Sequence, residues 1–150
     1  MNICFFDIDG VLNKKEDWTT LYSLDDKLIK IFCNILKDCK LTPVLTSSWR
    51  TGFVSPSSKK NTPNIQKLEE KLQKYGIKIY EKTPSLKGQS RDKEIERFLY
   101  YHENEVENYI IIDDDKTEFN KISEHNYFTD YKTGITKKDY DKIKKLIKKW

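Results

Sequence analysis

Short apolar runs recur along the chain, and each is followed by a cluster of polar residues. Runs of this length that stop abruptly are typical of strands buried on both faces. A shorter stretch at 126–129 suits a fifth strand. The four main runs cover residues 3–6, 41–46, 77–80 and 109–112.

Between these runs, apolar residues recur at helical spacing and predict four amphipathic helices. Their stripes start at Leu28, Ile65, Ile95 and Tyr140. Helix-start signals precede each stripe, because hydroxyl and carboxylate side chains satisfy the free N–H groups of a first turn. These signals are Ser23 with Asp26, Thr62 followed by Pro63, Ser90, and Thr136 with Asp139.

The alternation of strands and helices predicts an α/β fold. Repeated units of this length join parallel strands through right-handed crossovers, with helices on both faces of the sheet. We therefore expect a three-layer α/β/α sandwich with a parallel Rossmann-like sheet, formed as a single domain over residues 1–150. Ligands of such folds bind beyond the carboxyl ends of the strands, which is where the polar clusters fall.

Composition adds limits on the function. With a net charge of +4, the chain is only mildly basic and lacks the strong field of a dedicated nucleic-acid binder. Much of the excess lies at 137–149, where lysines fit a solvated helix face. The three cysteines have no metal-ligand spacing and suit a reduced interior. Without a membrane-length apolar run or a signal peptide, we expect a soluble, cytoplasmic monomer.

The first predicted strand ends in two carboxylates, Asp7 and Asp9, followed by Gly10. Side chains alternate along a strand, so both carboxylates would lie on one face if the strand continued. Like charges ~4 Å apart repel by about 4 kcal/mol at an effective dielectric of 20. A cation is therefore expected between them.

The ends of the other strands carry further polar groups. Hydroxyls follow the second strand, carboxylates follow the fourth, and basic residues precede the third helix. Several oxygens around one point favour Mg²⁺, and hydroxyl and basic groups would hold a phosphate. The groups are Thr46, Ser47 and Ser48; Asp113, Asp114 and Asp115; and Lys87, Arg91 and Lys93.

These residues resemble the motifs of the haloacid dehalogenase (HAD) superfamily of phosphatases. Phe6–Leu12 is similar to its first motif, Leu45-Thr46-Ser47 to its second and Ile111–Asp114 to its fourth, while Arg91 or Lys87 fits the basic third motif. A narrower likeness, to the small HAD domains of some nucleic-acid repair proteins, rests on residues 46–50, Thr83-Pro84, residues 91–95 and the Asp triplet.

The resemblance implies hydrolysis of a phosphomonoester through an aspartyl-phosphate. Asp7 would be the nucleophile and Asp9 the proton donor and acceptor. Ser47 or Thr46 would bind a phosphoryl oxygen, and Arg91 or Lys87 would hold the phosphate. Asp7, Asp113 and Asp114 would bind Mg²⁺, which Asp9 would contact through its main chain.

HAD enzymes often carry a cap domain, but residues 13–22 and 51–76 are too short for a full cap. An open site admits a phosphorylated nucleic-acid end, hypothetically a 3′-phosphate, with Ser48 and Arg50 as further substrate contacts. Arg50 also fits a structural ion pair. The alternatives are a phosphatase of a nucleotide, sugar or protein phosphate, and a non-catalytic module that binds metal and phosphate.

Overall fold

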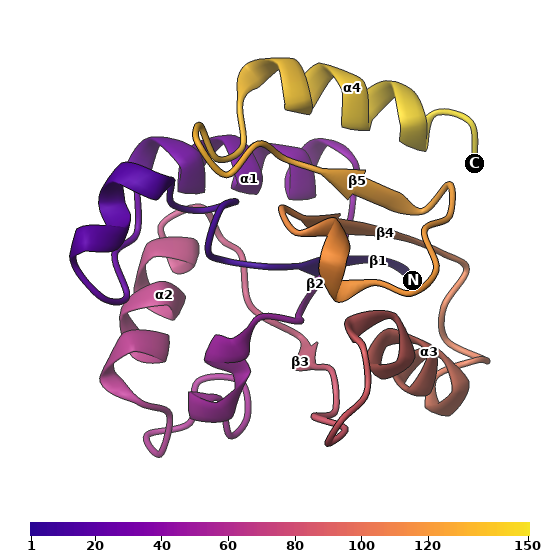
Figure 1. Cartoon of the computed structure of the whole chain (residues 1–150), viewed down its shortest axis with the longest axis horizontal. Helices are drawn as coiled ribbons and strands as arrows, with labels where there is room; N and C mark the ends of the chain where they lie inside the picture. Colours follow the sequence, from indigo (N-terminus) through magenta and orange to yellow (C-terminus); the bar gives the residue numbers. More distant parts are fainter.

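A five-stranded parallel sheet forms the centre of the protein, as seen in a computed structural model that describes residues 1–150 (Figure 1). The strand order is β3-β2-β1-β4-β5, so the first strand lies in the middle. The strands are β1 (Asn2–Phe6), β2 (Thr42–Leu45), β3 (Glu81–Lys82), β4 (Asn108–Asp113) and β5 (Asn126–Phe128).

Four α-helices cover the two faces of this sheet. Side chains of α1, α2 and α4 pack with one set of strand residues, whereas α3 packs with the opposite set. The helices are α1 (Asp26–Asp38), α2 (Pro63–Gln73), α3 (Arg91–Tyr101) and α4 (Lys137–Ile147). This is the predicted three-layer α/β/α architecture, and it has no large cap.

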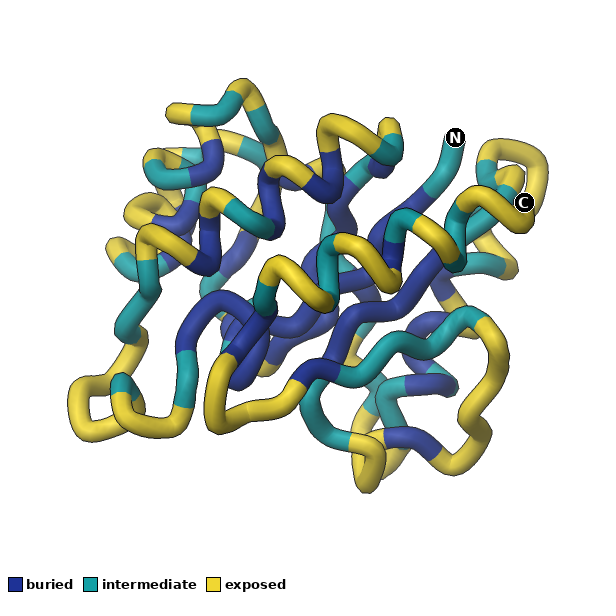
Figure 2. Tube along the Cα trace, turned by 90° about the horizontal axis from the view of Figure 1, so that it is seen from above, coloured by how far each residue is buried: buried dark blue, intermediate teal, exposed yellow.

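The central strand β1 shows why the layers form. Cys4 and Phe6 belong to the core beneath α1, α2 and α4, while Ile3 and Phe5 belong to the core beneath α3. All four side chains are fully buried, as expected when side chains alternate between two covered faces. Buried residues follow the strands and the inward sides of the helices in Figure 2.

Two predicted helix caps are confirmed and two differ. Thr62 caps α2, and Thr136 forms a capping box with Asp139 at the start of α4. At α1 the cap is Asp25, which accepts hydrogen bonds from the N–H groups of Lys27 and Leu28, so the predicted box from Ser23 was wrong. Ser90 precedes α3, but its hydroxyl accepts from Asn120 instead of capping the helix.

The predicted position of the third strand was also wrong. We predicted it at residues 77–80, but β3 is Glu81–Lys82 and pairs with Val44 and Leu45 of β2. Ile79 packs into the core before the ladder begins with the bond from the Tyr80 N–H to the Pro43 carbonyl. The apolar run at 77–80 therefore contains a residue buried beside the sheet, Ile79, and the residues that pair with β2 come directly after this run in the chain.

Short 3-10 helices stand next to the carboxyl edge of the sheet. They are η1 (Lys15–Thr19), η2 (Ser48–Gly52) and η3 (Lys116–Glu118). No helix has the length and hydropathy needed to span a membrane. Most lysines of α4 are exposed, as predicted for a solvated helix face.

Candidate active site

The site is built where β1 and β4 end side by side. Their register pairs Phe6 with Ile112, and the next backbone N–H of β1, that of Asp7, donates to the Ile112 carbonyl at 3.0 Å. Asp7 and Asp113 therefore lie side by side at the carboxyl edge of the sheet. Both are almost completely buried, at 6% and 0% exposed.

A cluster of three carboxylates results at this edge. One oxygen each from Asp7, Asp113 and Asp114 lies within 4.8 Å of the others. Backbone donors fix two of them, because Ile8 N–H donates to Asp7 Oδ1 at 2.8 Å and Asp115 N–H donates to Asp113 Oδ1 at 2.9 Å. Like charges this close together, two of them buried, require positive charge beside them.

Arg91, the first residue of α3, supplies part of that charge. Its NH1 atom donates to Asp113 Oδ2 at 2.7 Å and lies 3.5 Å from Asp7 Oδ2. The other two basic candidates lie elsewhere: Lys93 pairs with Glu96, and Lys87 is exposed on the preceding loop. Of the three, the structure brings Arg91 to the cluster.

The electrostatics of the cluster favour bound protons or a cation. Burial, reinforced by the charge of Asp113, raises the pKa of Asp7 well above its usual range despite the nearby Arg91. Burial and Asp113 likewise raise the pKa of Asp114 to about 6, although a hydrogen bond with Asp7 opposes the shift. Burial disfavours the Arg91 charge, but Asp7 and Asp113 outweigh it and raise the pKa of the guanidinium.

The donor set fits Mg²⁺. This ion takes oxygen ligands, commonly one or two carboxylates together with water and substrate phosphate. Asp7, Asp113 and Asp114 present only oxygens, and the raised pKa values of the Asp7 and Asp114 carboxyls indicate that the cluster is short of positive charge. One divalent cation would supply the missing charge.

Gly10 allows Asp114 to approach the β1 turn. A Cβ atom on Gly10 would lie 2.2 Å from Asp114 Oδ2, and its φ of +81° is a conformation that side chains disfavour. The turn is secured by Thr129, whose Oγ1 donates to the Gly10 carbonyl at 2.7 Å and whose N–H donates to the Asp113 carbonyl at 2.9 Å.

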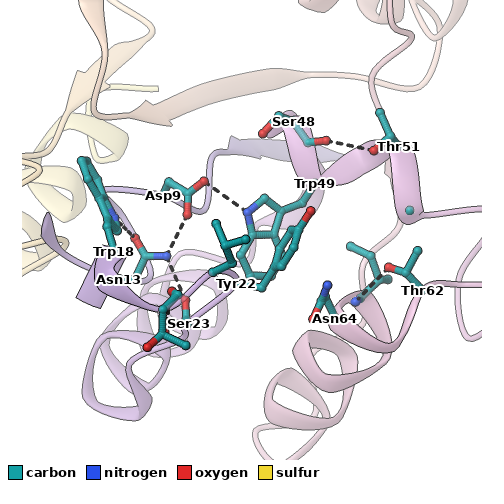
Figure 3. Close-up of a pocket in the computed structure, with 14 residues that line it drawn as sticks. Asp9, Asn13, Trp18, Tyr22, Ser23, Ser48, Trp49, Thr51, Thr62 and Asn64 are labelled. Atoms are coloured by element: carbon teal, nitrogen blue, oxygen red, sulfur yellow. Dashed lines mark hydrogen bonds between the residues drawn. The ribbon is translucent and has the colours of Figure 1, made fainter. Parts of the chain in front are cut away.

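Asp9 is not part of the carboxylate cluster and lines a neighbouring cavity (Figure 3). Its oxygens accept hydrogen bonds from Asn13 Nδ2 at 2.9 Å and from Trp49 Nε1 at 3.2 Å. Asn13 is itself fixed, because its Oδ1 accepts from the Gly10 N–H and from Trp18 Nε1 at 2.9 Å. The predicted proton-transfer group is therefore held by two donors at the edge of that cavity.

The hydroxyls after β2 differ in their partners. Ser47 Oγ accepts the Trp49 N–H at 3.2 Å and caps η2, whereas Thr46 Oγ1 is buried without a hydrogen-bond partner. Ser48 is exposed at the rim of the cavity. An unpaired buried hydroxyl is costly unless something bonds it, so Thr46 is the hydroxyl that lacks a partner in the protein.

Arg50, predicted to bind substrate, forms an ion pair in this structure. Its NH2 atom lies 2.6 Å from Glu94 Oε2, and its NH1 donates to the Thr46 carbonyl at 2.9 Å. Glu94 Oε2 also accepts the Leu86 N–H at 2.8 Å. Arg50 therefore forms the structural ion pair that the sequence offered as the alternative to a substrate contact. The Arg50–Glu94 pair connects the loops after β2 and β3 to the first turn of α3.

Sequence reasoning missed Asn13, Thr129 and Glu94, which position the site. Asn13 follows the Asp9-Gly10 turn by a few residues, and an amide at that point was a usable signal for a turn-stabilising side chain. Thr129 and Glu94 offered no such signal, because their partners lie far away in the chain: 119 residues from Thr129 to Gly10 and 44 from Glu94 to Arg50.

Comparison with known families identifies the family of the chain. Residues 3–140 match the family model described as HAD domain in Swiss Army Knife RNA repair proteins. The matched range includes every residue of the carboxylate cluster, Arg91 and Thr129. Comparisons with curated proteins and with solved structures found no match.

Proposed function

The chain belongs to the family of HAD domains found in Swiss Army Knife RNA repair proteins, and from this premise we propose that it is a Mg²⁺-dependent phosphomonoester hydrolase. The proposed substrate is a phosphorylated nucleic-acid end that carries a 3′-phosphate. Membership suggests a phosphatase-like role. The mechanism and the substrate are proposals that depend on the geometry of the site.

The observation that carries the proposal is the surroundings of Asp7. Its buried carboxylate lies within 4.8 Å of those of Asp113 and Asp114, and the Arg91 guanidinium is 3.5 Å away. A nucleophilic carboxylate must meet an anionic phosphate, and the repulsion between them has to be offset by positive charge. Arg91 and a cation in the acidic cluster would provide it.

The proposed reaction has two steps. An Asp7 oxygen attacks phosphorus, the bond to the leaving oxygen breaks, and Asp9 gives that oxygen a proton. Water then attacks the phosphorus of the aspartyl-phosphate and gives a proton to Asp9. Inorganic phosphate leaves and the Asp7 carboxylate is restored.

The remaining groups bind the phosphoryl oxygens. The Arg91 guanidinium is held by Asp113 and points at Asp7, which suits it to bridge nucleophile and phosphate. The unpaired hydroxyl favours Thr46 over Ser47 as the neutral donor. Mg²⁺ held by the Asp7, Asp113 and Asp114 carboxylates would neutralise charge that develops on the phosphoryl group.

Turnover tests the mechanism. We expect the purified protein to release phosphate from an aryl phosphate with Mg²⁺, and to stop doing so in EDTA. Asp7→Asn removes the nucleophile and should abolish release, while Asp141→Asn, an exposed carboxyl on α4, should retain it. Undiminished activity of Asp7→Asn would contradict the mechanism, and a metal-binding protein without turnover would favour a non-catalytic module.

A substrate comparison tests the nucleic-acid proposal. Oligonucleotides with a 3′- or 5′-phosphate are compared with mononucleotides, a sugar phosphate and a phosphopeptide by their kcat/KM values. The absence of a large cap supports access of a long substrate, so the oligonucleotides should be preferred. Equal or faster hydrolysis of the small compounds or the phosphopeptide would contradict that choice and favour the corresponding substrate class.

A further inference from the structure

A cavity of about 540 Å³ opens beside Asp9 (Figure 3). Its walls come from the segment after β1, from η2 and from the start of α2. This volume lies within the range of about 300–1,000 Å³ that is typical of small-molecule sites. The proposed function assigns no role to the cavity.

The position of Asp9 indicates which part of a substrate would enter. A general acid must be within hydrogen-bonding distance of the oxygen that it protonates. The Asp9 carboxylate lies at the cavity wall, where Asn13 and Trp49 hold it. The leaving oxygen therefore has to lie on this side of Asp7, and the group attached to that oxygen would extend into the cavity.

The lining indicates the chemistry of that group. Asp9 is the only charged residue among the 14 that line the cavity. A second phosphate would find no cation there. The other walls combine three aromatic rings, from Trp18, Tyr22 and Trp49, with hydroxyl and amide side chains. Such a surface suits an uncharged group that joins a flat ring to hydroxyls.

Tyr22 is the most distinctive part of this wall. Tyr22 is 50% exposed as a residue, yet its ring is positioned against Trp49 in an edge-on contact with ring centroids 5.0 Å apart. The backbone of Tyr22 has a φ of +59°, which is uncommon for a bulky side chain. The backbone is therefore strained at Tyr22, where it holds a solvent-facing aromatic ring next to the site.

We propose that this cavity binds the terminal nucleoside of the substrate strand, with its base packed on Tyr22 and its phosphate-bearing hydroxyl at Asp9. The proposal rests on the proposed function and narrows it: the enzyme recognises the nucleoside that carries the scissile phosphate. Phosphates further along the strand lie outside the cavity.

The kinetic test compares adenosine 3′-phosphate with glycerol 2-phosphate, which lacks a ring. Stacking of a base on an aromatic side chain is worth about 1–3 kcal/mol, so Tyr22→Ala should lower the ratio of the two kcat/KM values by about 5- to 150-fold. Tyr22→Phe should restore the ratio, and Tyr101→Ala, a tyrosine 70% exposed on α3, should not change it. An unchanged ratio in Tyr22→Ala would overturn the proposal.

A binding test separates this proposal from the proposed function. Adenosine is titrated into the Asp7→Asn protein and into its Tyr22→Ala derivative, with tryptophan fluorescence and NMR shifts as readouts. Saturable binding that weakens in the derivative supports the nucleoside site even if the wild-type protein shows no turnover. Binding that is equal in both proteins, or absent in both, would overturn the site even if phosphatase activity is found.

Discussion

Replacing Asp114 by asparagine should stabilise the metal-free protein at neutral pH. The pKa of this carboxyl is raised from 3.8 to about 6, chiefly by burial. A raised carboxyl pKa means that the folded state holds the proton more tightly than the unfolded state, so stability falls as pH rises from about 4 to about 6. Above that pH window the Asp114 carboxylate is charged and lowers the free energy of unfolding by its full amount. Asparagine carries no charge and removes this destabilisation.

The magnitude follows from the same shift. A change from 3.8 to about 6 is about 2 pKa units, or about 3 kcal/mol before screening. The Asp114 side chain is partly exposed and interacts with Asp7, so solvent screening reduces this figure to about 1–2 kcal/mol. For a chain of this size, the melting temperature should rise by about 2–8 °C.

Thermal unfolding followed by circular dichroism measures the effect. The wild type, Asp114→Asn and the exposed control Asp141→Asn are melted in EDTA near about pH 4 and about pH 7.5, and again with Mg²⁺. Asp114→Asn should exceed the wild type in EDTA at the higher pH and match it at the lower. Mg²⁺ should stabilise the wild type and Asp141→Asn by mass action, and Asp114→Asn much less.

Two results would refute this reasoning. One is a lower melting temperature of Asp114→Asn in EDTA at neutral pH, which would mean that the carboxylate stabilises the metal-free fold. The other is an equal response of wild type and Asp114→Asn to Mg²⁺, which would place the ion elsewhere.

Three further substitutions test other parts of the site. Gly10→Ala places a Cβ 2.2 Å from Asp114 Oδ2, so the affinity for Mg²⁺, measured by calorimetry, should fall by about 10- to 100-fold. Arg50→Ala leaves Glu94 buried without its partner, and urea unfolding should show a loss of about 3–5 kcal/mol. Thr46→Val removes an unpaired hydroxyl, so stability should change by less than about 1 kcal/mol while kcat/KM falls by about 100- to 1,000-fold.

Each of these predictions has a contrary outcome. An unchanged affinity for Mg²⁺ in Gly10→Ala would show that Asp114 moves aside without cost. If Arg50→Ala is as stable as the wild type but has a raised KM, then Arg50 contacts the substrate. Full activity of Thr46→Val would mean that Ser47, not Thr46, contacts the phosphoryl group. In that case Ser47→Ala should lower kcat/KM.

The sequence predicted the layers of the fold well because they depend on periodicity. Apolar runs marked β1, β2 and β4, and helical stripes marked all four helices. The error at β3 shows the limit of predicting strands from apolar runs. Ile79 is buried beside the sheet, and hydrophobicity alone does not distinguish a buried residue from one that pairs in a strand. At α1 the predicted cap Ser23 was wrong, because the path of the backbone places Asp25 at the start of the helix.

The site was predictable as far as it depends on strand ends. Parallel strands bring Asp7, Thr46 and Asp113 to one edge, whatever their separation in the chain. Side-chain direction was not predictable, because it depends on partners from other elements. Asp9 turns toward Trp49, 40 residues away, and Arg50 turns toward Glu94, 44 residues away.

The central position of β1 has a consequence for synthesis of the protein. β1 leaves the ribosome before either of its neighbours, β2 and β4, and β4 carries two of the three clustered carboxylates within or just after it. Residue 113 must therefore emerge before Asp7 can meet its acidic neighbours. Contacts between such distant segments form late because long loops must close first. A nascent chain that ends before β4 would expose the strand that bears the nucleophile but would contain no metal site.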